Sequence, residues 1–149
     1  MIVANMKFEN FQLKNPDKSE FDLYNYLGEN KGIIIFFRST WCSFCKRQLA
    51  DFQNHYDDFV QAGVKIIAIS NDTELKTSLL QNFLYLKFPL LSDINSELIK
   101  KYNLSTTYKD ELVSKPAIFI IDQEKNIKNT FISEDYDNVL SAKIILAKV

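Results

Sequence analysis

The chain has 149 residues, of which 46% are hydrophobic and 13% aromatic, and its 18 basic and 19 acidic side chains leave a formal net charge of −1. This composition is too apolar for a disordered chain, and no apolar run approaches the length of about 20 residues that spans a bilayer, so we expect no membrane association. The near-balance of charge argues against nucleic acid as a partner.

The first half of the chain has the pattern of a hairpin, a buried strand and a long helix. Apolar residues on both sides of the turn Asn15-Pro16-Asp17 predict a short hairpin over residues 7–23. The continuous apolar run 33–37 is typical of a central strand that is covered on both faces. Apolar residues then recur with helical spacing over residues 43–62, and Gly63 follows. We therefore expect one amphipathic helix that is closed by a left-handed glycine.

The second half continues the alternation of strands and helices. The remaining expected elements, in chain order, are a parallel strand over 64–69, a helix from Asp72 or Thr73 to about Phe83, an extended piece at 89–91, a helix from Asn95 or Ser96 to about Tyr102, antiparallel strands over 117–121 and 127–132 joined by the polar loop 122–126, and a closing helix over 136–148. No repeat or long linker divides the chain. The sequence therefore predicts one α/β domain over residues 1–149.

Glycine and cysteine usage narrows the chemistry. The three glycines are too few and too far apart for a dinucleotide-binding turn or a phosphate-binding loop, so we expect no nucleotide cofactor. The two cysteines, Cys42 and Cys45, are too few for a disulfide scaffold, and we interpret them as a reactive pair. The opening Met-Ile-Val-Ala-Asn-Met-Lys lacks the features of a secretory signal, so we expect a reducing cytoplasm as the compartment.

The cysteine pair lies between the end of the expected central strand and the start of the long helix. At a helix N-terminus, free backbone N–H groups and the helix dipole both stabilise a thiolate. Residues 31–50 include four cations and no carboxylate, and these charges act in the same direction. We therefore expect a lowered pKa for Cys42. The four cations are Lys31, Arg38, Lys46 and Arg47.

The spacing of the pair also predicts a reversible disulfide. Three residues make about one helical turn, which puts both sulfur atoms on one face. We expect Cys42 to be the more exposed, attacking thiol and Cys45 the more buried, resolving one. Inert core cysteines are the plain alternative. A zinc site is not expected, because His55 lies ten residues beyond Cys45, a rise of roughly 15 Å.

Two further residues belong to this candidate site. Trp41, next to Cys42, either packs in the interior or offers a docking surface for partners, and we favour docking. Pro116 precedes the expected strand 117–121, where its missing N–H is tolerated.

Four stretches together resemble the alkyl hydroperoxide reductase and thiol-specific antioxidant family of thioredoxin-fold proteins: residues 36–49 with the W-C-x-x-C motif, 67–72, 88–93 and 116–122. The F-P-L-L-S-D stretch at 88–93 is similar to peroxiredoxins of the bacterioferritin comigratory type. The resemblance implies a thioredoxin fold, with a central mixed β-sheet flanked by helices and an N-terminal hairpin extension. It also implies a cis bond before Pro116, packing of Pro116 against the cysteine pair, and a thioredoxin-like reductant.

The chain departs from this family at several positions. The proline that peroxiredoxins carry seven residues before the reactive cysteine is replaced by Ile35, while Ser39 keeps the hydroxyl three residues before it. The family's peroxide-binding arginine would fall at Pro116, which leaves Arg38 as its candidate substitute. The buried acid of thioredoxins falls at Phe36, so no proton acceptor for the resolving cysteine is identified.

Three functions follow in order of preference. The first is a thiol-disulfide oxidoreductase that exchanges electrons with a thioredoxin-like reductant or a protein disulfide. The second is a thiol peroxidase that reduces hydroperoxides through a Cys42 sulfenic acid. The third is a redox-inert binding module. We expect the protein to be a monomer or a homodimer. The expected supporting residues are Arg38, Ser39, Thr40, Trp41 and Pro116.

Overall fold

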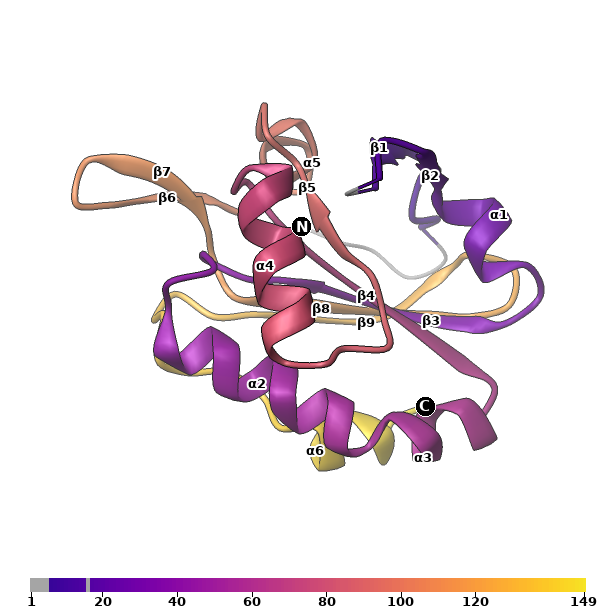
Figure 1. Ribbon diagram of the computed structural model, residues 1–149. Helices are drawn as coiled ribbons and strands as arrows, with labels where there is room; N and C mark the ends of the chain where they lie inside the picture. The colour runs from indigo at the N-terminus through magenta and orange to yellow at the C-terminus, as the bar shows by residue number, and fades with distance from the viewer. Residues whose placement is uncertain (1–5, 16) are drawn as a thin grey trace.

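The computed structural model describes residues 6–15 and 17–149, and a five-stranded mixed sheet forms its centre (Figure 1). The strand order is β5-β4-β3-β8-β9. The central strand β3 (Lys31–Phe36) pairs in parallel with β4 (Val64–Ser70), which pairs in parallel with β5 (Leu90–Ser92). On its other side, β3 pairs antiparallel with β8 (Ala117–Ile121), and β9 (Ile127–Ile132) completes the sheet. All five strands were expected from the sequence.

The alternation of side chains along β3 divides the core between the two faces of the sheet. Ile33 and Ile35 pack with the apolar side chains of α2 (Ser43–Asn54), α3 (Tyr56–Gln61) and α6 (Ala142–Leu146). Ile34 and Phe36 pack on the opposite face with α1 (Leu23–Leu27), α5 (Glu97–Lys101) and the N-terminal segment. Because both faces are covered, β3 is continuously apolar from Ile33 to Phe36, as the sequence indicates.

The N-terminal hairpin and the starts of two helices agree with the predictions, although only the first helix has a side-chain cap. Strands β1 (Gln12–Lys14) and β2 (Glu20–Asp22) pair antiparallel, and Pro16 of the expected turn lies outside the described residues. Helix α4 (Glu74–Phe83) begins after Thr73, whose hydroxyl accepts a hydrogen bond from the Lys76 N–H. Ser96 precedes α5.

The expected single helix over 43–62 is wrong, because the structure has two helices that meet at His55. The backbone of His55 (φ −105°, ψ 13°) leaves the helical region, and its ring Nδ1 lies 3.0 Å from the Asp51 carbonyl oxygen. The break allows the rings of Phe52 and Phe59 to stack at 5.6 Å between centroids. Gly63 follows α3 with φ +74°, as expected.

The expected closing helix over 136–148 is also too long, since α6 covers only Ala142–Leu146. The Ser141 hydroxyl caps α6 by accepting a hydrogen bond from the Ile144 N–H. The Ala142 N–H, in the first turn of the helix, donates to the Asp51 carboxylate at 2.7 Å. The residues before Ser141 make tertiary contacts instead, because the Leu140 carbonyl accepts from the Gln48 side chain.

A second hairpin was not predicted at all. Strands β6 (Ser105–Tyr108) and β7 (Glu111–Ser114) pair with each other and project beyond the central sheet (Figure 1). Their turn residues Lys109 and Asp110 both have positive φ, which is the geometry of a type I′ turn. Because this turn contains no glycine and the strands are mostly exposed, neither turn composition nor apolar alternation marks the hairpin.

The expected cis bond before Pro116 is wrong, since the described residues contain no cis peptide bond. The trans form is intrinsically preferred, and the backbone groups on both sides of this bond are hydrogen-bonded. The Lys115 N–H donates to the Leu104 carbonyl and the Pro116 carbonyl accepts from the Ser133 N–H. Among the helices of residues 6–15 and 17–149, none combines the length and apolar character needed to cross a bilayer.

Candidate active site

The cysteine pair lies at the junction of β3 and α2, where the chain turns from the sheet into the helix. Cys42 is the N-cap of α2, and its sulfur accepts a hydrogen bond from the Cys45 backbone N–H at 3.3 Å. The sequence supports this turn because the apolar strand ends at the polar residues Arg38 to Thr40. Both thiols are free. The expected one-turn relation between the two cysteines is therefore present.

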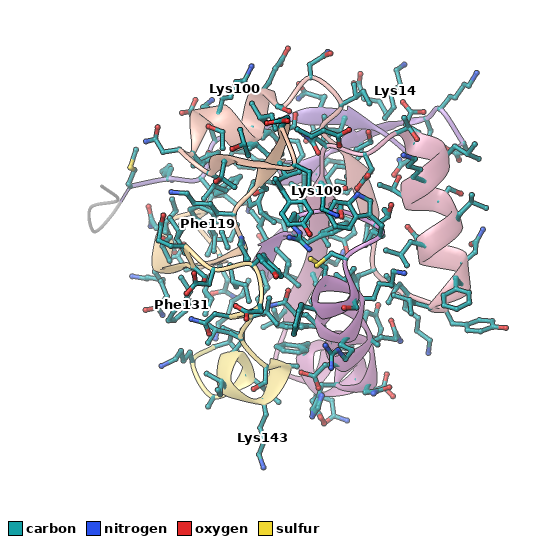
Figure 2. All side chains as sticks on the ribbon, turned by 90° about the vertical axis from the view of Figure 1, so that its left-hand side faces the viewer. Lys14, Lys100, Lys109, Phe119, Phe131 and Lys143 are labelled. Carbon is teal, nitrogen blue, oxygen red and sulfur yellow. The ribbon has the colours of Figure 1, made fainter. Side chains whose placement is uncertain are left out.

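Both cysteines are buried, so the expected difference in exposure between Cys42 and Cys45 is almost absent. The exposed fraction is 1% for Cys42 and 0% for Cys45. Both belong to the apolar cluster that includes Ile35 and Leu49. Aromatic side chains from sequence-distant segments gather around the neighbouring Arg38, as described below. Figure 2 looks onto the end of the molecule where these segments meet, with Lys109 of the β6–β7 turn at the centre of the view.

The pKa values of the two thiols shift in opposite directions. The Cys45 thiol, by donating a hydrogen bond to the Cys42 sulfur, lowers the pKa of Cys42 to about 5. The Cys45 backbone N–H and the positive charge of Arg38 act in the same direction, against the effect of burial. The same hydrogen bond, together with burial and the nearby negative charge, raises the pKa of Cys45. At neutral pH these shifts favour a thiolate at Cys42 and a protonated thiol at Cys45.

Arg38 lies beside Cys42 in a cage of aromatic rings. Its guanidinium carbon is 4.1 Å from the ring centres of both Tyr108 and Tyr136 and 4.6 Å from that of Trp41. Arg38 is 5% exposed, and its Nε and Nη1 atoms are buried without a hydrogen-bond partner. Cation–π contacts therefore take the place that a carboxylate usually fills beside a buried arginine.

A small cavity of about 70 Å³ borders this cage. Arg38 and Pro116 both line it, as do Tyr108 and Tyr136. Lys115 and Glu134, which form an ion pair at 3.0 Å, lie at the same cavity. Pro116 is thus placed close to Arg38, although its peptide bond is trans.

The remaining expected residues order the loop before α2. The Thr40 N–H donates to the Asp72 carboxylate at 2.9 Å, and the Ser70 hydroxyl donates to the same oxygen at 2.8 Å. Ser39 is buried, its carbonyl accepts from the Cys42 N–H, and its hydroxyl has no partner. Trp41 is 46% exposed, so it contributes both to the Arg38 cage and to the surface.

Sequence reasoning missed Asp72 as a support of this loop, and it missed Tyr108 and Tyr136 entirely. Asp72 was noted only as a possible helix cap. The two tyrosines are far from Cys42 in the chain, and nothing in their local sequence indicates contact with Arg38. A systematic search for aromatic partners of the uncompensated Arg38 could have proposed them. Within the described residues, no three His, Cys, Asp or Glu side chains are grouped as a metal site would require.

Comparison with known folds and families places this geometry in context. The AhpC/TSA family profile matches residues 4–130. The crystal structure of peroxidoxin BcpB from Mycobacterium tuberculosis superposes with a TM-score of 0.87 and 19% identity, covering 99% of this chain and 96% of that one. For Enterococcus faecalis AhpC the TM-score is 0.86 at 21% identity, covering 99% and 90%. These structural similarities concern the fold.

Two sequence relatives are thiol-disulfide oxidoreductases by name. ResA of Oceanobacillus iheyensis is 34% identical over 126 residues, which covers 72% of this chain and 65% of the relative. Sporulation thiol-disulfide oxidoreductase A of Bacillus subtilis is 29% identical over 107 residues, covering 68% of this chain and 60% of the relative. The matches therefore span less than two thirds of each relative's length.

Proposed function

The chain belongs to the AhpC/TSA family, and from that membership we propose that it is a thiol-disulfide oxidoreductase with Cys42 as nucleophile and Cys45 as resolving cysteine. The hydrogen bonding between the two cysteines carries the proposal. The Cys42 sulfur accepts from the Cys45 N–H, and its pKa is lowered to about 5. At neutral pH Cys42 is then the thiolate, which is the attacking form. The names of the sequence relatives support the same reaction.

The reaction proceeds in two exchanges. The Cys42 thiolate attacks one sulfur of a partner disulfide, the partner's S–S bond breaks, and its second sulfur leaves as a thiolate. Cys45 then attacks the Cys42 sulfur of this mixed disulfide and releases the partner's first sulfur. The proton of Cys45 passes to a departing thiolate. Two electrons move to the partner, and a thioredoxin-like dithiol protein then reduces the Cys42–Cys45 disulfide.

The order of the two steps follows from the coupling of the thiols. The pKa of Cys45 is raised chiefly by its hydrogen bond to Cys42, with contributions from burial and from the Cys42 charge. Once the Cys42 sulfur is part of a neutral mixed disulfide, its negative charge is gone. The pKa of Cys45 then falls, and Cys45 becomes a nucleophile only after Cys42 has reacted.

Trapping of the mixed disulfide tests this assignment. Each single Cys→Ser variant is incubated with a disulfide-linked peptide, and the adducts are mapped by mass spectrometry. We expect the Cys45→Ser protein to accumulate an adduct on Cys42, because the resolving step is missing. The Cys42→Ser protein should form little adduct, since Cys45 is fully buried. Adducts in the Cys42→Ser protein alone would reverse the roles, and none in either protein would contradict the proposal.

A second candidate activity is peroxide reduction. The Ser39 hydroxyl, which is buried without a partner, and the Arg38 charge both favour it. Cys42 is only 1% exposed, and a sulfur so buried suits a very small substrate. In this reaction Cys42 attacks one peroxide oxygen, the O–O bond breaks, and a sulfenic acid and water or an alcohol form. Cys45 then displaces water and forms the disulfide. Rapid mixing with hydrogen peroxide tests it, and a rate no faster than that of a free thiol contradicts it.

A further inference from the structure

The arginine beside Cys42 is held by residues that the reaction scheme does not use. We propose that Tyr108 and Tyr136 are positioning residues, which clamp Arg38 against Cys42 and restrict access to the Cys42 sulfur. This inference rests on the proposed function, in which Cys42 is the nucleophile. We call Arg38, Trp41, Tyr108 and Tyr136 together the aromatic clamp.

The first argument concerns charge. A buried guanidinium is usually compensated by a carboxylate, and that partner would neutralise its field. In the clamp, ring centres at 4.1, 4.1 and 4.6 Å stabilise Arg38 instead. Aromatic rings carry a quadrupole but no net charge, so they stabilise a desolvated cation without cancelling it. The full positive charge of Arg38 thus remains available to the thiolate.

The second argument concerns the origin of the rings, which come from three separate segments. Trp41 lies in the loop before α2, Tyr108 is the last residue of β6, and Tyr136 lies between β9 and α6. They also contact one another, with 5.2 Å between the Trp41 and Tyr108 centroids and 5.8 Å between those of Tyr108 and Tyr136. Phe44 of α2 continues the cluster at 5.9 Å from Tyr136. The arrangement therefore fixes Arg38 from several directions at once.

The third argument concerns access. Cys42 is 1% exposed, yet attack on a protein disulfide requires its sulfur to meet a second sulfur in line. The β6–β7 hairpin is a separate two-stranded sheet, tied to the β4–α4 loop by the Asn71 side-chain amide, which donates to the Leu112 carbonyl at 2.8 Å. Movement of this hairpin would withdraw Tyr108 from Arg38 and leave the central sheet intact. The clamp is therefore placed to control both the charge at Cys42 and the approach to it.

Other charged groups near the site are few and fixed in place. Asp72 is bonded to the Thr40 N–H, and Lys115 pairs with Glu134 across the small cavity. Lys109 lies 5.4 Å from the Tyr108 ring centre. Cys45 is the remaining titratable neighbour, and its thiol donates a hydrogen bond to the Cys42 sulfur. Substitution of either tyrosine leaves all these charges unchanged, so an effect on Cys42 can be assigned to Arg38.

The test measures alkylation of Cys42 against pH, with the modified peptide identified by mass spectrometry. Tyr108→Leu and Tyr136→Leu remove a ring, whereas Tyr108→Phe and Tyr136→Phe keep the ring and remove only the hydroxyl. Tyr85→Leu is the matched control, because Tyr85 is 85% exposed and lies just beyond the C-terminus of α4. Iodoacetamide serves as the small reagent and a polyethylene glycol maleimide as the bulky one.

We expect each Leu variant to raise the alkylation midpoint by about one pH unit, which corresponds to roughly tenfold less thiolate at pH values below the original midpoint. The high-pH rate with the bulky reagent should rise several-fold relative to the rate with iodoacetamide. The Phe variants and Tyr85→Leu should keep the midpoint of the unmodified protein. Tyr136 is 43% exposed, so its replacement leaves the core intact and provides a folded test variant.

Two results would overturn the inference. One is an unchanged midpoint in both Leu variants, which would mean that the rings do not hold Arg38. The other is an equal shift in the Phe variants, which would assign the effect to the hydroxyl groups. Alkylation involves no disulfide exchange, so a failure here is distinguishable from the absence of mixed disulfides, which would contradict the proposed function itself.

Discussion

Replacement of Cys42 by serine should remove a pH dependence of stability that the thiolate creates. The pKa of Cys42 is about 5 in the folded protein, whereas an unfolded cysteine titrates near about 8.5. Between these values the unfolded chain binds the additional proton, so the free energy of unfolding rises with pH. This stabilisation is complete above about pH 8.5 and is lost as the pH falls through about 5.

The magnitude follows from the difference between the two pKa values. About 3.5 units at 1.36 kcal/mol each give a limit of about 5 kcal/mol, reached above the unfolded pKa. The part gained between pH 5 and pH 7 is about 2 kcal/mol. Cys45 does not affect this range, because its raised pKa makes a difference only at pH values where the unfolded thiol ionises.

Urea unfolding at pH 5 and pH 7 in the presence of a reductant measures this difference. From pH 5 to pH 7 the free energy of unfolding should rise by about 2 kcal/mol more in the unmodified protein than in Cys42→Ser, because the two proteins share all other titrating groups. Cys45→Ser is the control, since its hydroxyl still donates to the Cys42 sulfur, and it should keep most of the gain. Equal gains in the unmodified protein and Cys42→Ser would refute the reasoning.

Three further predictions concern the surroundings of the thiolate. Cys45→Ala should raise the alkylation midpoint of Cys42 by more than Cys45→Ser does, because only the Ala variant lacks a side-chain donor to the Cys42 sulfur. Equal midpoints in the two variants would argue against the hydrogen bond from the Cys45 side chain to Cys42. Asp72→Ala should lower the free energy of unfolding by about 1–3 kcal/mol in urea, because the Thr40 N–H loses its acceptor, and Asp72→Asn should lose less. Gly32→Ala should lower the melting temperature and reduce the free energy of unfolding by about 1–3 kcal/mol, because a Cβ there would lie 3.0 Å from side-chain atoms of Ile121 and Leu27. An unchanged melting temperature would show that these two side chains move aside without cost.

The central sheet could be predicted because its strands are written as continuous apolar runs. Ile33 to Phe36 are fully buried and face both layers of the core, which is the environment that such a run predicts. The helix that follows the cysteines was also recognised, but its break at His55 was not. That break accompanies the stacking of Phe52 on Phe59, a side-chain contact without a local signature in the sequence.

The candidate site was predictable only in the part that is local in sequence. Residues 38–45 form one turn and the start of one helix, so their spacing was enough to place the two cysteines together. The contacts of Arg38 with Tyr108 and Tyr136 were not predictable in this way, because Tyr108 lies in a hairpin with no glycine at its turn and Tyr136 lies in a loop that was mistaken for helix. The family resemblance implied a cis bond before Pro116, but the bond is trans, which is the intrinsically preferred form.

The acidity of Cys42 is the claim on which the rest of the account depends. Its direct measurement is the titration of the thiolate in the reduced, unmodified protein, followed by thiolate absorbance and by alkylation of Cys42 at each pH. We expect a midpoint near the value of about 5, with Cys45 unreactive across the same range. A midpoint near the roughly 8.5 of an ordinary cysteine, or preferential alkylation of Cys45, would contradict it.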